Sequence, residues 1–130
     1  MPRRKSEPIN QVESLAEIPV SANALTHSIL EYLILRGAYA WRNNSGAARV
    51  EGNSNQRGRF IRYGKKGSGD ILGILPNGKF LSVEVKAGRD RLRPEQQEFM
   101  DDINIRGGVA MVARSLDDVI ERIEKELELA

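Results

Sequence analysis

At 130 residues the chain has the usual size of one domain, and 40% hydrophobic and 29% charged residues are typical of a globular protein. It contains no cysteine, which excludes a disulfide framework and a thiolate metal site. The formal charge of +2 is unevenly distributed along the sequence, because basic residues concentrate between residues 36 and 66 and acidic residues between 117 and 128. On charge alone, this pattern is equally typical of a basic face for a polyanion and of a solvated loop.

The N-terminal segment over residues 1–20 combines basic residues, prolines and scattered polar residues without a sustained period. We expect it to be a flexible arm that precedes a single domain over residues 21–130. No stretch approaches the ~18 apolar residues of a membrane span, and the N-terminus lacks the apolar region of a signal peptide. The sequence therefore predicts a cytoplasmic protein with no membrane partner.

The first predicted element is a helix that Ser21 caps and Gly37 ends, with Leu25, Ile29 and Leu33 recurring every four residues. A short strand over residues 38–41 follows. Residues 43–55 are rich in Asn, Ser, Gly and Ala, which predicts a long loop of the kind that often carries function.

The second half of the chain predicts strands first and then alternating helices and strands. Residues 59–63 alternate as a strand, and the apolar runs over 71–75 and 80–86 flank an Asn77-Gly78 turn, a strong hairpin signal. A helix from Pro94 to Ile105, a strand over 109–113 and a helix capped by Ser115 complete the order. This order predicts an α/β fold with a mixed β-sheet flanked by α-helices.

Two carboxylates and one amine are expected to meet at one end of the predicted hairpin. Glu84 and Lys86 are two residues apart on a strand and share a face, and pairing around the turn brings Asp70 beside them. Hard oxygen ligands of this kind suit Mg²⁺ or Mn²⁺, and a nearby cation serves phosphodiester hydrolysis. The alternative is a solvated strand edge with a cross-strand ion pair.

In combination, these residues resemble the PD-(D/E)xK nuclease motif and, more closely, the VRR-NUC family of virus-type replication-repair nucleases. The resemblance covers the chain from about residue 22 to residue 123. It implies a restriction-endonuclease-like core, and it is carried by Ile29-Leu30-Glu31-Tyr32-Leu33, Ala40-Trp41-Arg42-Asn43-Asn44-Ser45-Gly46, Gly67-Ser68-Gly69-Asp70-Ile71, Glu84-Val85-Lys86, Pro94-Glu95-Gln96, Gly107-Gly108-Val109-Ala110 and Ala113-Arg114-Ser115.

The resemblance implies a role for each residue of this set. Asp70 and Glu84 would bind Mg²⁺ or Mn²⁺, with the Val85 carbonyl as a further candidate ligand. Lys86 would orient the attacking water. Gln96 is similar to a family glutamine that touches the site, and its alternative is a solvent-facing residue of the second helix.

The chain departs from the family pattern at two places. Gly69 stands where the family commonly has proline, and Ala22 or Asn23 stands where related nucleases often have a metal-binding glutamate. Glu31 is the nearest carboxylate of that helix and a candidate extra ligand. The alternative for Glu31 is an exposed pair with His27, four residues earlier.

Several polar and basic residues near this set are candidates for contact with DNA. They are Arg42, Asn43, Arg57, Arg59, Lys65, Lys66 and Ser68. None forms a base-reading pattern, so binding is expected to follow DNA shape and backbone. Trp41 could stack on a base, and its alternative places are the core and a subunit interface.

These observations predict a metal-dependent DNA endonuclease. Stand-alone members of the family are phage- or bacteria-associated and are similar to Holliday-junction resolvases. This similarity implies a homodimer that prefers branched DNA. The expected location is the cytoplasm of a bacterial or phage-infected cell. One alternative is a non-catalytic nucleic-acid-binding module with the same fold, which the missing helix glutamate favours. The other alternative is a structural protein in which the Glu84–Lys86 pair only protects a strand edge.

Overall fold

The computed structural model describes residues 21–43, 46–50 and 58–128. The predicted arm over residues 1–20 and the candidate Arg57 lie outside these residues. The elements, in chain order, are α2 (Ala22–Leu35), β1 (Tyr39–Arg42), β2 (Gly46–Val50), β3 (Arg59–Tyr63), β4 (Ile71–Ile74), β5 (Phe80–Val85), α3 (Pro94–Ile105), β6 (Val109–Ala113) and α4 (Leu116–Glu128).

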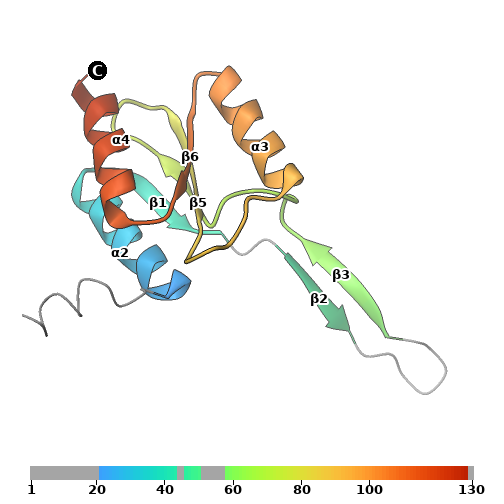
Figure 1. Ribbon diagram of the computed structural model, residues 1–130. Coiled ribbons are helices and arrows are strands. Elements are labelled where there is room, and N and C mark those ends of the chain that lie inside the picture. Colours follow the sequence, from blue (N-terminus) through green and yellow to red (C-terminus); the bar gives the residue numbers. More distant parts are fainter. Residues whose placement is uncertain (1–20, 44–45, 51–57, 129–130) are drawn as a thin grey trace, which may run out of the picture.

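A four-stranded mixed sheet lies between the helices (Figure 1). Its order is β1-β4-β5-β6, in which β1, β4 and β5 are antiparallel and β6 runs parallel to β5. Helices α2 and α4 cover one face of the sheet, and α3 lies on the other (Figure 1). The predicted α/β fold with a mixed sheet flanked by helices is confirmed.

The loop predicted over residues 43–55 is only partly a loop. Residues Gly46–Val50 form β2, which pairs antiparallel with β3 so that Gly46 faces Tyr63 and Val50 faces Arg59. The prediction was wrong here because small residues at the start of this segment give no alternating apolar signal. A strand of this composition depends on the backbone hydrogen bonds of its partner strand rather than on its own propensity.

The main core forms between α2, α4 and the sheet. As predicted, Ser21 caps α2 and accepts a hydrogen bond from the Ala24 N–H at 3.1 Å. The helix buries one apolar stripe against the strands, while Phe99 and Met100 of α3 are buried on the other side. The core cluster consists of Leu25, Ile29, Leu33, Ala38, Ile71, Leu75, Leu81, Val83, Val85, Val109, Ala113, Val119 and Ile123.

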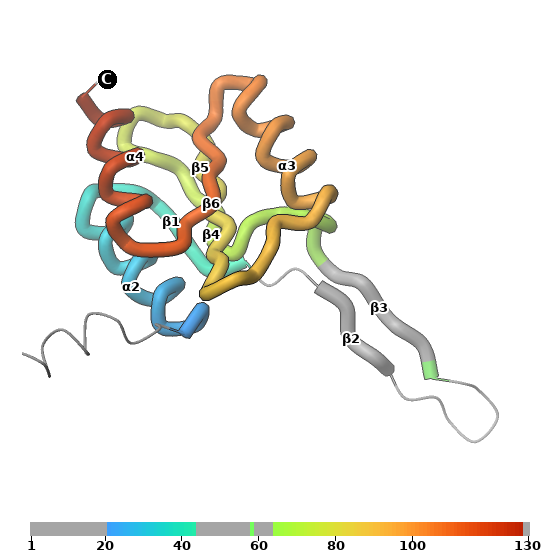
Figure 2. The backbone as a smooth tube through the Cα atoms, viewed as in Figure 1, coloured from blue at the N-terminus to red at the C-terminus, as the bar shows by residue number. Residues whose placement is uncertain are grey.

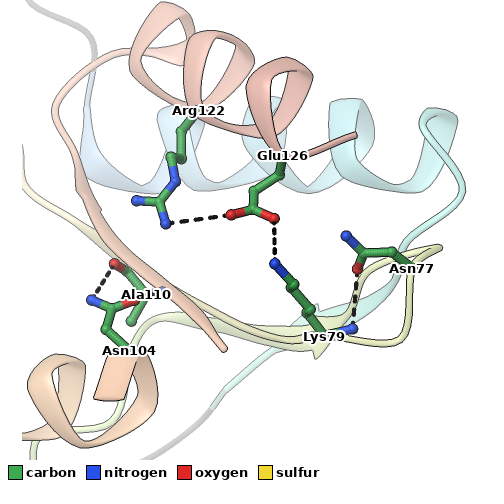
Figure 3. Close-up of polar contacts among 6 residues, drawn as sticks. All are labelled: Asn77, Lys79, Asn104, Ala110, Arg122 and Glu126. Carbon is green, nitrogen blue, oxygen red and sulfur yellow. Dashed lines mark hydrogen bonds and ion pairs between the residues drawn. The ribbon is translucent and has the colours of Figure 1, made fainter. Parts of the chain in front are cut away.

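The β4–β5 hairpin forms around the predicted Asn77-Gly78 turn. Gly78 has a φ of 86°, a conformation that suits glycine, and the Asn77 side chain accepts a hydrogen bond from the Lys79 N–H at 3.1 Å. The Lys79 amine then reaches Glu126 of α4 at 3.0 Å (Figure 3). The turn is thereby tied to the helix layer, which fixes the register of the two strands that carry the site.

Strand β6 is an edge of the described sheet, and one side chain covers part of that edge. Asn104 of α3 accepts a hydrogen bond from the Ala110 N–H at 2.9 Å and donates one to the Ala110 carbonyl at 3.1 Å (Figure 3). The amide thus satisfies both backbone groups of a buried residue, as a neighbouring strand would. It also joins the end of α3 to the sheet.

Replacement of Asn104 by alanine is expected to lower the free energy of unfolding by about 1–3 kcal/mol, because Ala110 loses both hydrogen bonds. Urea unfolding of the purified variant measures the change. The control is Gln97→Ala on the same helix, which removes only an exposed pair with Asp101 and should change stability by less than about 0.5 kcal/mol. Equal stability of the two variants would contradict this role.

Candidate active site

The β4–β5 pairing brings Asp70 and Glu84 to the same end of the sheet. Ile71 faces Val83 in the register, so Asp70, one residue earlier, lies opposite Glu84, one residue later. Asp70 Oδ2 also accepts a hydrogen bond from the Val85 N–H at 2.7 Å. Val85 points its side chain into the core, which leaves Glu84 and its neighbour Lys86 on the opposite face.

Glu84 and Lys86 are buried, with 5% and 7% of each residue exposed. The Lys86 amine lies 3.4 Å from Glu84 Oε1. A solvated ion pair at a strand edge, the alternative considered from the sequence, does not fit these values. Buried ionisable groups cost free energy to desolvate, and such groups concentrate at functional sites.

The carboxyl of Glu84 holds a proton more strongly than an ordinary glutamate. Burial, the nearby charge of Asp70 and a hydrogen bond with Asp70 raise its pKa from 4.5 to about 7, although Lys86 acts in the opposite direction. Without an additional cation, it is therefore unfavourable for Asp70 and Glu84 both to be ionised. A divalent cation beside both carboxylates would remove this resistance.

Gln96 in the first turn of α3 contacts the site directly. Its Nε2 donates to Glu84 Oε1 at 2.8 Å, and its Oε1 accepts from the Arg93 N–H at 2.9 Å. Both ends of the amide are engaged, so its orientation is determined by these two partners. The structure thus places Gln96 on Glu84 rather than facing solvent, the alternative considered from the sequence.

Asn43 and Ser68 hold the turn that carries Asp70. The Asn43 N–H donates to the Asp70 carbonyl at 2.8 Å, and its side chain donates to Ser68 Oγ at 2.7 Å and to the Gly69 carbonyl at 2.9 Å. Ser68 is buried and donates to the Lys65 carbonyl at 2.7 Å. Both residues were candidates for DNA contact, but their polar groups point inward and position the turn.

Glycine is required at two places in this turn. Gly67 has a φ of 83°, and a Cβ there would overlap the Glu95 carbonyl oxygen at the start of α3. At Gly69, where the family commonly has proline, a Cβ would overlap Ser82 Oγ and approach the Val83 backbone. The departure from proline therefore has a steric reason, because Ser82 occupies the space that the ring would need.

The donor set fits a hard divalent cation. Asp70 uses Oδ2 for Val85, and Glu84 uses Oε1 for Gln96 and Lys86. Asp70 and Glu84 also share a hydrogen bond, so the two carboxyl groups are in direct contact. Mg²⁺ and Mn²⁺ prefer this kind of site, with one or two carboxylates and the remaining positions taken by water and phosphate.

The structure does not bring Glu31 to these carboxylates. No group of three acidic or histidine side chains that could hold a metal occurs in the part of the chain that the structure describes. Glu31 is exposed and lies 3.4 Å from His27 Nε2, the alternative considered from the sequence. Nearer the start of α2, Asn23 accepts a hydrogen bond from the Arg42 guanidinium at 2.7 Å, where related nucleases often have glutamate.

The basic candidates differ in their placement. Lys65 and Lys66 are exposed in the turn that precedes Asp70, and Arg42 is exposed at the end of β1. Arg59 begins β3. The loop between Lys86 and α3 carries three further alternating arginines, Arg89, Arg91 and Arg93, which were not among the predicted DNA contacts.

The raised pKa of Glu84 predicts a pH-dependent stability for the metal-free protein. The folded protein keeps a proton that the unfolded chain releases at pH 4.5, so this stabilisation is complete below pH 4.5 and is lost as the pH rises to about 7. The expected loss is up to about 3 kcal/mol. Urea unfolding across this range should show the loss in the wild type and not in Glu84→Gln, whereas identical profiles would contradict it.

Comparison with known proteins places the chain in a family. The model described as VRR-NUC domain matches residues 30–117, more than half of the chain and the whole of the site described above. The comparisons with curated proteins and with solved structures give no match. On the family match, the chain belongs to the VRR-NUC family, a family of nucleases.

Proposed function

We propose that the protein is an endonuclease that hydrolyses DNA phosphodiester bonds with Mg²⁺ or Mn²⁺. The observation that carries this proposal is the buried Glu84 carboxyl beside the partly buried Asp70, with the Lys86 amine 3.4 Å from Glu84. The family match supports nuclease activity in general. The metal dependence rests on the carboxylate oxygens and on the raised pKa of Glu84.

Each residue of the site has a distinct task in this reaction. Asp70 and Glu84, with the Val85 carbonyl, would hold the metal ion, which when bound polarises the phosphoryl oxygen and acidifies a water. Lys86 orients the attacking water from the same face of β5. Gln96 holds Glu84 in position through its 2.8 Å hydrogen bond. Hydrolysis adds the water oxygen to phosphorus, breaks one ester bond and returns a proton to the leaving oxygen.

Asp70→Ala and Lys86→Ala are each expected to lower the cleavage rate by about 10³-fold or more, because one removes a metal ligand and the other the group that orients water. Cleavage of labelled DNA with Mn²⁺ and with EDTA measures the effect, and circular dichroism checks the fold. Glu121→Ala, an exposed carboxylate of α4, is the matched control and should cleave as the wild type does.

Full activity of both variants would overturn the proposal. The absence of a helix glutamate at Ala22 or Asn23 favours one other function, a nucleic-acid-binding module without catalysis. Calorimetric titration with Mn²⁺ separates the two, because such a module would bind DNA without a metal site that depends on Asp70. DNA binding without Mn²⁺ binding and without cleavage would establish the module.

The proposal includes DNA as the partner, and branched DNA in particular, with the cytoplasm of a bacterial or phage-infected cell as the location. Of the helices that the structure describes, none is long and apolar enough to cross a membrane. The chain offers Lys65, Lys66 and Arg42 as exposed cations near the site, and these suit a phosphate backbone. A four-way junction has two symmetric strands to cut, which a two-fold dimer matches.

An exposed apolar face supports the homodimer. Tyr39, Ile74 and Phe80 face one another across β1, β4 and β5, and the Trp41 ring lies 5.6 Å from that of Tyr39. Tyr39 is 75% exposed, and the other three are each more than a third exposed. A contiguous exposed patch of large uncharged side chains is typical of an interaction site.

Ile74→Asp is expected to convert a dimer into a monomer and to reduce the preference for four-way junctions over linear duplex, because it buries a charge against its own copy. Sedimentation velocity measures the mass. Trp41 is the only tryptophan, so its fluorescence on dilution of the wild type reports the same surface. Ile105→Asp, at an 81% exposed position on α3, is the control. A monomeric wild type would contradict the proposal.

A further inference from the structure

Several of the described cations on the α2 and α4 side of the fold and at the far end of α3 have a carboxylate partner. These pairs are Arg36 with Glu124, Lys79 with Glu126, Arg122 with Glu126 and Arg106 with Asp102.

The loop over residues 87–93, which joins Lys86 to α3, breaks this pattern. Arg89, Arg91 and Arg93 are exposed, and none forms an ion pair with a residue in the described ranges. Asp90 lies among them and is also exposed, and its backbone N–H donates to the Ala87 carbonyl at 3.1 Å. Its side chain forms no ion pair with a residue that the structure describes. Three arginines so close together repel one another, and this costs stability unless an anion compensates.

The loop is held next to the catalytic residues. At its start, the Lys86 N–H donates to the Ala113 carbonyl at 3.0 Å, and the Arg114 guanidinium donates to the Gly88 carbonyl at 3.3 Å. At its end, the Arg93 N–H donates to Gln96, which in turn contacts Glu84. The arginine loop is thus attached at both ends to residues of the site.

A second basic segment lies beside this loop. The turn that carries Lys65 and Lys66 packs against the start of α3, where Gly67 lies in contact with the Glu95 backbone. Figure 2 shows the gold segment leading into α3 next to the green segment leading into β4. Lys65 and Lys66 are exposed and, like the arginines of the loop, form no ion pair with a residue in the described ranges. One segment leads into Asp70 and the other leads out of Lys86.

We propose that Arg89 and Arg91 bind the backbone phosphates of the substrate DNA on the α3 side of the site. This inference rests on the proposed nuclease function and adds a binding surface to it. Phosphate is the ligand that fits, because arginine presents a fork of donors to a phosphate and the loop offers no arrangement of groups for reading a base edge. The lysine turn leads into Asp70 and the arginine loop leads out of Lys86, so a strand held by both would pass close to the carboxylates.

The salt dependence of DNA binding tests this surface. Affinity for a short labelled duplex is measured between about 50 and 200 mM salt, with Ca²⁺ in place of Mg²⁺ so that the DNA stays intact. Each arginine that neutralises a phosphate steepens the plot of log affinity against log salt by about 1. The double variant Arg89→Ala, Arg91→Ala should therefore have a slope shallower by about 2 and a lower affinity.

Two further variants separate a phosphate contact from a structural effect. Arg91→Lys should keep its share of the slope, because a point charge still neutralises a phosphate. Arg106→Ala removes one exposed, paired arginine from the far end of α3 and should leave the slope unchanged.

The outcomes distinguish this inference from the function on which it rests. A double variant with the wild-type slope, in a protein that binds and cleaves DNA, would overturn the phosphate surface alone. A wild type that neither binds nor cleaves DNA would overturn the nuclease proposal itself. A slope reduced equally by Arg106→Ala would also overturn the inference, because it would show a general effect of charge.

Discussion

The structure is arranged around one interaction that costs free energy of folding, a glutamate carboxyl buried beside a second carboxylate. Glu84 lies on β5, beside β4 in the sheet and in contact with Gln96 of α3. Its raised pKa shows that the fold disfavours its negative charge. Replacing such a pair by apolar residues is often neutral or stabilising in other proteins, so stability does not explain its presence. The divalent cation of the proposed function would explain it, because a cation between the two carboxylates would compensate both charges at once.

The surrounding elements can be understood as supports for this pair. The Asn77-Gly78 turn and the Lys79–Glu126 contact set the register that places Asp70 opposite Glu84. Asn43 fixes the backbone of Asp70 from the β1 side, and Gln96 fixes Glu84 from the α3 side. The two carboxylates are thus held by different layers of the fold, and their separation is determined by the packing of β1, β4, β5 and α3.

Local signals in the sequence predicted most of the fold and the centre of the site. The cap at Ser21, the Asn-Gly turn and the Glu84-x-Lys86 spacing each depend on neighbouring residues, and the structure reproduces all three. Strand β2 was missed because its pairing with β3 leaves no trace in its own composition. The inward orientation of Ser68 was missed for a related reason, because its partner Asn43 lies 25 residues away in the sequence. Contacts of this kind come from tertiary packing, which a periodic pattern does not encode.

The charge segregation along the chain has a different meaning once the chain is folded. The acidic C-terminal helix supplies Glu124 and Glu126, which neutralise Arg36 and Lys79 on the side of the fold away from the carboxylates. The same helix makes no such pair with Lys65, Lys66 or the arginines over residues 89–93 among the described contacts. A net charge of +2 is therefore compatible with a basic surface near the site, because Glu124 and Glu126 pair with cations on the opposite side of the fold. The carboxylates of the site would repel a phosphate. In the proposed reaction, the approach of a DNA backbone would therefore depend both on the metal ion and on the nearby cations that pair with no described carboxylate.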